Sequence, residues 1–327
     1  MRFCVLGARF PPLSGALFFL CLLLYGCAAP QTRALPSLSP PLPAHVELSE
    51  TPFFAQSAYQ CGPAALATAL AAAGIPADPV ALTEQVYVPA RQGSLQIEML
   101  AAARRNGAVA VEIEPALSTV LQIVADGYPV IVLQNLGLSW FPRWHYAVLI
   151  GYDLDSRSVV LRSGTTHRHV MPMGTFERTW KRSGSWAMAA LRPGRVPAGL
   201  REEDYLRAAI AFEGGADAQE SLRAYDGAVH RWPASRMAWL GAGNSAYRLE
   251  DWPRAEEAFG RAAELPGDPA PALNNLAMTL AAQGRTIEAI AAAEQAVAAG
   301  GRFEATARET LARLRRLQEH PGGGTQR

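Results

Sequence analysis

The spacing of apolar and polar residues changes along the chain, and the changes mark boundaries between parts. Between residues 51 and 194 the pattern predicts four helices, at Gly62–Ala73, Asp78–Val86, Ser94–Asn106 and Leu117–Ala125. Short apolar or alternating runs predict strands at Val109–Ile113, Pro129–Gln134, His145–Tyr152, Ser158–Arg162 and Trp186–Leu191. Most of the helices come before an antiparallel sheet, which is the order of an α+β domain.

From Arg201 onward the sequence is rich in alanine and repeats with a period of 34 residues. The repeat is carried by two sets of positions, Ala228, Ala262 and Ala296 and also Tyr205, Trp239 and Leu273. Small residues at fixed positions let paired helices approach, and stacked pairs bury a core that one pair alone cannot.

The stretch W-L-G-A-G-N-S-A-Y from Trp239 resembles the tetratricopeptide repeat consensus. The resemblance implies an all-α solenoid over residues 201–318, with Glu304–Leu317 as a capping helix and a concave surface that binds a protein or peptide partner. Residues 319–327 are predicted to be a disordered tail. An unrelated helical bundle is the alternative, and the repeated apolar positions fit it less well.

The first 27 residues have the pattern of an export signal. Arg2 and Arg9 precede an almost uncharged run, residues 13–25, which is short for a membrane span and typical of a secretory signal peptide over residues 1–26. The tetrapeptide L-Y-G-C that ends at Cys27 resembles the bacterial lipobox. The resemblance implies a lipid on Cys27 that anchors the chain to a membrane, with the periplasmic face of the outer membrane as the expected place in the bacterial cell envelope. An uncleaved membrane anchor is the alternative.

Residues 27–50 contain five prolines and little periodicity. Such a segment is predicted to be a semi-rigid tether. At about 3 Å per residue it would hold a domain roughly 70 Å from a membrane surface.

Composition and charge exclude several classes of protein and of partner. Half of the residues are apolar and 18% are charged, which excludes disordered and fibrous chains. The 30 basic and 29 acidic side chains nearly cancel, so nothing in the charge favours nucleic acid as a partner. Loss of residues 1–26 would leave Cys27 and Cys61 as the only cysteines. With a lipid on Cys27, Cys61 is the one free thiol and a candidate reactive group.

Cys61 stands where a loop is predicted to turn into a helix. Gly62 permits a tight entry, and Pro63 suits the first turn because its missing N–H has no helical partner to lose. A thiol at this end of the helix meets free N–H groups and the positive end of the helix dipole, and both favour thiolate. The sequence therefore predicts Cys61 as a nucleophile.

A nucleophilic cysteine needs a histidine nearby in space to act as its base. Three of the six histidines fall in the predicted tether, repeats and tail, which leaves His145, His167 and His169. His145 opens the most strand-like run of the domain and follows an irregular loop, residues 137–144. His145 is therefore the predicted base.

The motif Q-x-x-x-x-C-G-P-A-A-L from Gln56, followed about 80 residues later by H-Y-A-V-L-I-G-Y-D from His145, resembles the bacteriocin-processing, double-glycine leader peptidases and their relatives. The resemblance covers residues 51–194. It implies a papain-like cysteine peptidase domain that cleaves a peptide or protein through Cys61 and His145. It also implies that Gln56 donates to the oxyanion of the reacting carbonyl, and Gln60 is the alternative donor.

One position departs from the pattern of that family. Its members carry an Asp or Asn on the strand after the histidine strand, which orients the imidazole, and Ser163 stands in that place here. A cysteine enzyme depends on this carboxylate less than a serine enzyme does. Asp153 is the alternative orienting residue, although its place in a predicted turn suits a turn cap better.

Two further groups of side chains admit more than one interpretation. His167 and His169 lie two residues apart and could ligate a metal, but no third ligand has convincing spacing, so neither a metal nor a cofactor is predicted. The aromatic residues around His145 can line a substrate groove or form ordinary core under a loop: Trp140, Phe141, Trp144 and Tyr146.

The leading hypothesis is a lipid-anchored cysteine peptidase with protein-binding repeats. The first alternative is a catalytically silent lipoprotein that binds peptides on the same fold, and the missing acidic residue favours it. The second is an acyl transferase, in which the acyl group on Cys61 passes to an amine rather than to water.

Overall fold

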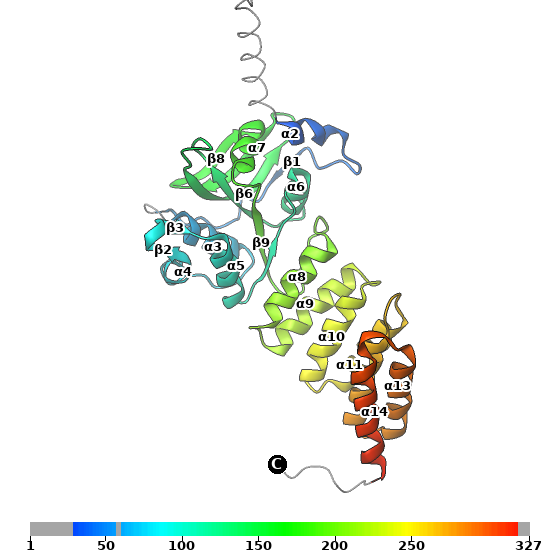
Figure 1. Cartoon of the computed structure of the whole chain (residues 1–327). Helices are drawn as coiled ribbons and strands as arrows, with labels where there is room; N and C mark the ends of the chain where they lie inside the picture. The colour runs from blue at the N-terminus through cyan, green and yellow to red at the C-terminus, as the bar shows by residue number, and fades with distance from the viewer. Residues whose placement is uncertain (1–28, 57–59, 320–327) are drawn as a thin grey trace, which may run out of the picture.

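The computed structural model describes residues 29–56 and 60–319 of the 327-residue chain. It contains a mixed unit of helices and strands, followed by a row of helices that leads away from it (Figure 1). The predicted signal peptide, the predicted lipid attachment site Cys27 and residues 320–327 lie outside the described residues. Among the described helices, none combines the length and apolar character that a membrane span requires.

The helical half of the first unit surrounds α3, Cys61–Ala72. Residues 62–70 of α3 are all buried, because alanines and leucines leave this helix without a polar face. The neighbouring helices are α4, Pro79–Val86, and α5, Gln96–Arg105. Asp78 caps α4 by accepting the N–H of Val80, as expected from the sequence.

A short hairpin joins α4 to α5. Its strands are β2, Tyr87–Val88, and β3, Gly93–Ser94, and the 3-10 turn η2, Pro89–Arg91, connects them. Gln92 closes the turn with a left-handed backbone, at a φ of 48°.

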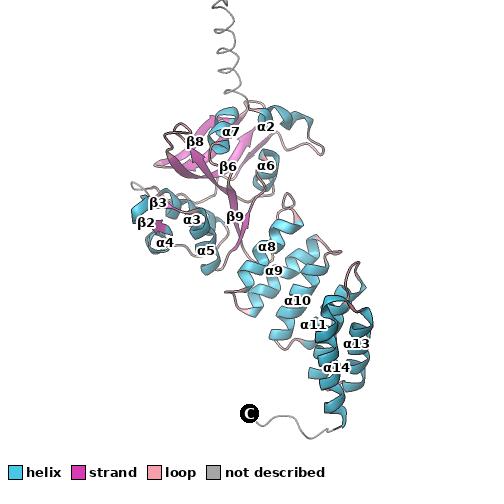
Figure 2. Ribbon diagram, in the orientation of Figure 1, coloured by secondary structure: helices cyan, strands magenta, loops and turns pink. Residues whose placement is uncertain are grey.

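The other half is an antiparallel sheet in the order β4-β9-β5-β6-β7-β8, with β1 added beside the end of β6. The strands are β1, His45–Glu47; β4, Val109–Glu112; β5, Val130–Asn135; β6, Trp144–Asp153; β7, Ser158–Ser163; β8, Thr166–Pro172; and β9, Ala187–Leu191. Helices α6, Leu117–Ala125, and α7, Met173–Lys181, pack on one face of the sheet, and α3 packs on the other (Figure 2).

The predicted fold class, an α+β domain followed by an all-α solenoid, is confirmed. The predicted helices and strands of the first unit are present, with ends shifted by two residues at most. The sequence did not predict strands β1, β2, β3 and β8 or helix α7. The side chains of β8 are mostly exposed and polar, so that this strand shows no alternation of apolar and polar positions.

The predicted tether over residues 27–50 is wrong for the described part of that segment. Residues 30–37 form a short helix, α2, Pro30–Ala34, and a 3-10 turn, η1, Leu35–Ser37. Leu35 and Leu42 are buried in the same core as the sheet, and β1 pairs with β6. The prediction failed because a proline-rich sequence shows only that long regular helices or strands are absent. It does not show whether the segment packs against distant parts of the chain.

A buried carboxylate fastens this N-terminal segment to α7. Glu177 is only 1% exposed and accepts hydrogen bonds from the backbone N–H of Gln31, at 3.0 Å, and from the N–H and hydroxyl of Thr32, both at 2.7 Å. The side-chain oxygen of Gln31 in turn accepts the N–H of Leu117 at the start of α6. The segment therefore satisfies polar groups of two helices at once.

Residues 202–319 form three antiparallel helix pairs and a final helix. Their bounds are α8, Glu202–Glu213; α9, Ala218–Arg231; α10, Arg236–Arg248; α11, Trp252–Glu264; α12, Ala270–Ala282; α13, Thr286–Ala299; and α14, Glu304–Glu319. Small residues are required where the helices cross. A Cβ on Gly241 would lie 2.2 Å from the ring of Tyr225, and a Cβ on Gly243 would lie 2.6 Å from the ring of Phe259.

The two units share one apolar core. Tyr205 and Phe212 of α8 belong to the same buried cluster as Val109 of β4. Around this contact, Asp126 accepts the N–H of Gly199 at 2.9 Å, and Arg201 forms an ion pair with Glu114 at 3.1 Å. The repeats therefore extend the sheet unit directly, without a flexible linker between residues 192 and 202.

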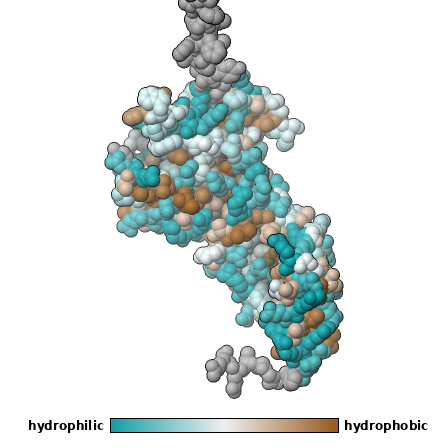
Figure 3. Space-filling view, in the orientation of Figure 1, coloured by the Kyte–Doolittle hydropathy of each residue, from teal (hydrophilic) through white to brown (hydrophobic). Residues whose placement is uncertain are grey.

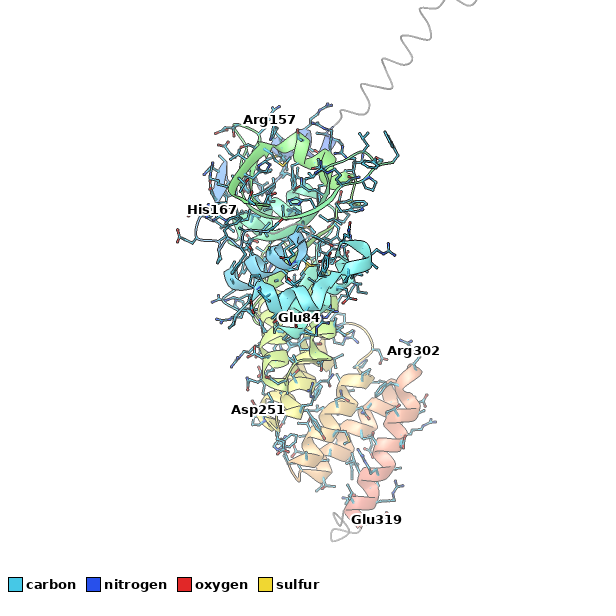
Figure 4. All side chains as sticks on the ribbon, turned by 90° about the vertical axis from the view of Figure 1, so that its left-hand side faces the viewer. Glu84, Arg157, His167, Asp251, Arg302 and Glu319 are labelled. Atoms are coloured by element: carbon cyan, nitrogen blue, oxygen red, sulfur yellow. The ribbon has the colours of Figure 1, made fainter. Side chains whose placement is uncertain are left out.

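The substitution Glu177→Gln should loosen the N-terminal segment while the sheet stays folded. The two oxygens of Glu177 accept N–H groups of different residues, so the NH₂ group of a glutamine would face an N–H donor on one side. At least one hydrogen bond to a charged acceptor is therefore lost, at a cost of about 1.5–3 kcal/mol. Hydrogen exchange at these two amides should speed up about tenfold or more. Glu84→Gln, an exposed change on α4 (Figure 4), is the control. Equal exchange in both variants would contradict the role of Glu177.

Candidate active site

Cys61 is the first residue of α3 and is half-buried where this helix meets the sheet. The backbone N–H groups of Tyr146, the residue after His145, of Gly62 and of Cys61 itself lie near its sulfur and lower its pKa. A Cβ at position 62 would lie 2.2 Å from the hydroxyl oxygen of Ser94. Glycine is therefore needed at this position for the β2–β3 hairpin to come close to the thiol.

Burial decides the protonation state of the thiol. It raises the pKa of Cys61 above its ordinary value of 9.0 and outweighs the three N–H groups, which act in the opposite direction. The sequence-based expectation that the helix N-terminus favours thiolate is thus right in the sign of the N–H contribution and wrong in the net result. Position along a helix is visible in the sequence, whereas the depth of the sulfur is not.

Burial also lowers the pKa of His145 below 6.5, and the charge of His169 adds to this effect. Both shifts favour the uncharged forms. Near neutral pH the cleft therefore holds a thiol and a neutral imidazole rather than an ion pair.

His145 stands at the beginning of β6, opposite Gln134 of β5. Its Nε2 atom lies 2.8 Å from the hydroxyl oxygen of Ser163, the last residue of β7. Nδ1 is then the nitrogen available to a proton from the cleft. Asp153 lies at the opposite end of β6, where its carboxylate accepts the N–H of Ser156 at 2.8 Å and thus caps the turn. The structure therefore brings Ser163, and not Asp153, to the imidazole.

Gln56 lies on a segment that a buried arginine holds in place. Arg162 is 3% exposed and donates to the carbonyl of Ser49, at 2.7 Å, and to the carbonyl of Thr51, at 2.8 and 3.1 Å. Farther along, the N–H of Gln56 donates to the carbonyl of Gly164 at 3.2 Å. The turn that follows Ser163 thus also fixes the backbone of Gln56. Gln60, the alternative donor, is the N-cap residue of α3.

These side chains line one cleft of about 920 Å³. Cys61, His145 and Gln56 belong to its wall, together with the β2–β3 hairpin and the turn at residues 164–165. Trp144 and Tyr146 line it as well, and the hydroxyl of Tyr146 donates to the carbonyl of Ser94 at 3.2 Å. Trp140, at 81% exposed, and Phe141 lie outside the cleft wall on the β5–β6 loop. The predicted aromatic cluster is therefore divided between the cleft and the surface.

His167, one of the two histidines considered as metal ligands, has partners within the domain. Nδ1 of His167 accepts a hydrogen bond from the guanidinium of Arg162 at 3.1 Å, and the His167 ring packs edge-on against Phe53 at 5.4 Å. Within residues 29–56 and 60–319, no three histidine, cysteine or acidic side chains are grouped so that they could hold a metal ion.

The sequence analysis missed Arg162 as an organiser of the site. A signal was present, because an arginine follows the apolar residues Val159–Leu161 inside a predicted strand. A charged residue in such a run must find partners in the interior. The backbone N–H of Tyr146 was also missed, and no side-chain pattern reveals which backbone group will face a sulfur atom.

Comparison with known proteins finds a family match in each of the two units. Residues 48–188 match the Peptidase_C39 like family, and residues 206–270 and 240–302 match the Tetratricopeptide repeat family. A solved structure from Bacillus anthracis, assigned as a C39-like peptidase, is 21% identical, covers 45% of this chain and 97% of its own length, and superposes with a TM-score of 0.39. Among curated proteins there is no significant match. The chain thus combines a Peptidase C39-like domain with tetratricopeptide repeats.

Replacing the hydroxyl beside His145 with a carboxylate should raise the pKa of this histidine. In Ser163→Asp the acid would lie next to Nε2 and stabilise the imidazolium, which typically raises a histidine pKa by about one to three units. NMR titration of labelled histidines measures the shift, and the resonance of His145 is identified by its loss in His145→Ala. Ser158→Asp, at the other end of β7, is the control. A similar shift in both variants would show that the contact with Ser163 does not control the imidazole.

Proposed function

We propose that this chain is a cysteine peptidase anchored in the cell envelope, with Cys61 as nucleophile and His145 as general base. The observation that carries the proposal is one cleft that is lined by Cys61, His145 and Gln56, with Ser163 in contact with the imidazole. The match of residues 48–188 to a peptidase family supports it independently of the geometry.

In the proposed reaction, Nδ1 of His145 removes the thiol proton as the sulfur of Cys61 bonds to the carbonyl carbon of a peptide. The electron pair of the carbonyl moves to its oxygen, and the amide of Gln56 and a backbone N–H near the sulfur stabilise the resulting oxyanion. Collapse of this intermediate expels the amine, which takes the proton from the imidazolium. Water, deprotonated by His145, then hydrolyses the thioester and restores the thiol.

The starting state of this mechanism is uncharged, since the pKa of Cys61 is raised and that of His145 is lowered. Proton transfer from sulfur to nitrogen is then a step of the reaction, because the resting pair holds little thiolate. Each unit by which the thiol pKa exceeds the imidazole pKa adds about 1.4 kcal/mol to the formation of the ion pair. Stabilisation of the oxyanion has to offset this cost.

We further infer that Cys27 carries the lipid and that the repeats hold a protein partner. The lipobox-like residues before Cys27 support the anchor, and the repeat match supports the partner. Since residue 29 already belongs to the folded unit, an anchor at Cys27 would keep the domain next to the membrane rather than at the end of a stalk.

A second candidate function is peptide binding without cleavage. Two observations favour it: Ser163 replaces the acidic orienting residue, and the Cys61–His145 pair is uncharged. The two candidates differ in a direct way, because only the peptidase releases new amino termini. An acyl transferase would instead form an adduct when an amine is added to the reaction.

The peptidase is tested with a library of proteome-derived peptides and detection of new termini by mass spectrometry. Cys61→Ser should abolish cleavage and retain the fold, and His145→Ala should lower kcat by at least about a thousandfold, since each removes a reacting group. Gln56→Ala should lower kcat by about 10²–10³. Gln60→Ala is its matched control and should have a small effect.

Three results would count against the assignment. Cleavage by the Cys61→Ser variant would exclude the thiol as nucleophile. A larger loss in Gln60→Ala than in Gln56→Ala would move the oxyanion role to Gln60. Peptide binding by the wild-type chain without new termini would favour the second candidate.

The pH dependence gives a separate prediction. Burial lowers the pKa of His145, so its neutral, basic form persists to lower pH than that of an exposed histidine. The acidic limb of kcat/KM should therefore have its midpoint below pH 6.5. Ser163→Asp should move this midpoint upward. A midpoint above pH 6.5 in the wild-type chain would contradict the proposed environment of His145.

A further inference from the structure

The cleft around Cys61 carries positive charge on its walls. Two arginines, Arg91 and Arg143, line it, and among the described residues no aspartate or glutamate does. Neither guanidinium takes part in an ion pair within the described ranges. Elsewhere on this protein surface arginines do find carboxylates, as Arg168 does with Glu47 at 2.7 Å. The two arginines of the cleft are therefore free to meet charge from outside the chain.

Each arginine comes from a different half of the domain. Arg91 ends η2 in the β2–β3 hairpin, which belongs to the helical half. Arg143 immediately precedes β6, in the sheet half. A peptide that lies along the cleft past Cys61 would run between the two halves and within reach of both charges.

The hairpin that carries Arg91 is held against the rest of the domain at Ser94. The carbonyl of Ser94, in the same hairpin, accepts the hydroxyl of Tyr146 at 3.2 Å, and the missing Cβ of Gly62 lets the hairpin approach α3. The left-handed turn at Gln92 closes the hairpin directly after Arg91.

The backbone at Arg143 is held by Asn135. The side-chain oxygen of this residue accepts the N–H groups of Gly137 and Arg143, both at 2.9 Å. A Cβ on Gly137 would lie 2.4 Å from the carbonyl oxygen of Phe141, so the loop closes tightly on itself. Both charges thus stand on fixed backbone, which lowers the entropy lost when a ligand binds.

We propose that the cleft selects acidic peptides and that Arg91 and Arg143 are its specificity-determining residues. Leu95, Leu133 and Trp144 line the same space, so the favoured peptide carries aspartate or glutamate next to apolar side chains. The inference rests on the proposed function, since it takes the cleft as the substrate site. Partly exposed ion pairs of this kind each change affinity by a factor of about two to five, and they also raise the association rate.

The charge of the cleft can be measured on Cys61 itself, without any substrate. Iodoacetate is negatively charged and iodoacetamide is neutral, and both alkylate the same sulfur. The ratio of their rate constants cancels any change in the thiol pKa and reports the local potential. Mass spectrometry of the Cys61 peptide from the full chain separates this site from the other cysteines.

The double variant Arg91→Glu/Arg143→Glu should lower the iodoacetate to iodoacetamide ratio about fivefold or more at low salt, and the difference should shrink at 1 M salt. Arg157→Glu is the matched control. It reverses one charge, as each substitution of the double variant does, but in the turn between β6 and β7, at the end of the domain far from Glu84 (Figure 4), and should leave the ratio unchanged. An equal ratio in wild type and double variant, or an equal fall in Arg157→Glu, would overturn the proposal.

Selection is then measured with matched peptides. A fluorescent decapeptide rich in glutamate and leucine is compared with its glutamine counterpart, in fluorescence anisotropy with the full-length Cys61→Ser chain. Two such ion pairs should make the acidic peptide bind about four- to twenty-fivefold more tightly, and the double arginine variant should remove most of that preference. Equal affinity for both peptides would overturn the proposal. Acidic selectivity without cleavage by the wild-type chain would support it while the proposed peptidase activity fails.

Discussion

The burial of α3 against the sheet is the contact on which the remaining structure depends. Alanines and leucines leave this helix no face for water, so it packs in the middle of the domain with Leu66 and Leu70 against Val148 and Ile150 of β6. The same contact places the N-terminus of the helix beside the beginning of β6, where the sulfur of Cys61 lies near the N–H of Tyr146. It also explains the protonation state of the site, since the packing that positions the thiol withdraws it from water.

Around that contact, buried polar groups fix segments that have little apolar surface of their own. Arg162 holds the irregular segment before Gln56 through carbonyl oxygens rather than through a carboxylate, and Glu177 holds the N-terminal helix through N–H groups. In both cases a charge inside the protein is matched by backbone dipoles, which satisfies it without a second buried ion. On the face of the molecule that Figure 3 shows, hydrophilic and hydrophobic residues are mixed over both units.

Local pattern was enough to find α3, the cap at Asp78, the helix Leu117–Ala125 and the repeats, because periodicity and capping act over a few residues. The resemblance to the leader peptidases, rather than local pattern, pointed to Ser163, whose hydroxyl lies 2.8 Å from His145. Local pattern failed for residues 29–48, whose order depends on Glu177 about 145 residues away. It also failed for the pKa of Cys61, which depends on how deeply the sulfur is buried. Those properties arise from tertiary contacts, which no single stretch of sequence encodes.

The shared core of α8 and the sheet sets the direction of the repeats relative to the active-site cleft. Since Tyr205 and Phe212 are packed with Val109 of the sheet, the row of repeats leaves the domain in one direction (Figure 1). A substrate polypeptide that binds to the repeats and also passes Cys61 would have to span a fixed distance between the two sites. The distance along that chain from the held segment to the cleft, and not only its local sequence, would then decide which bond comes to the thiol.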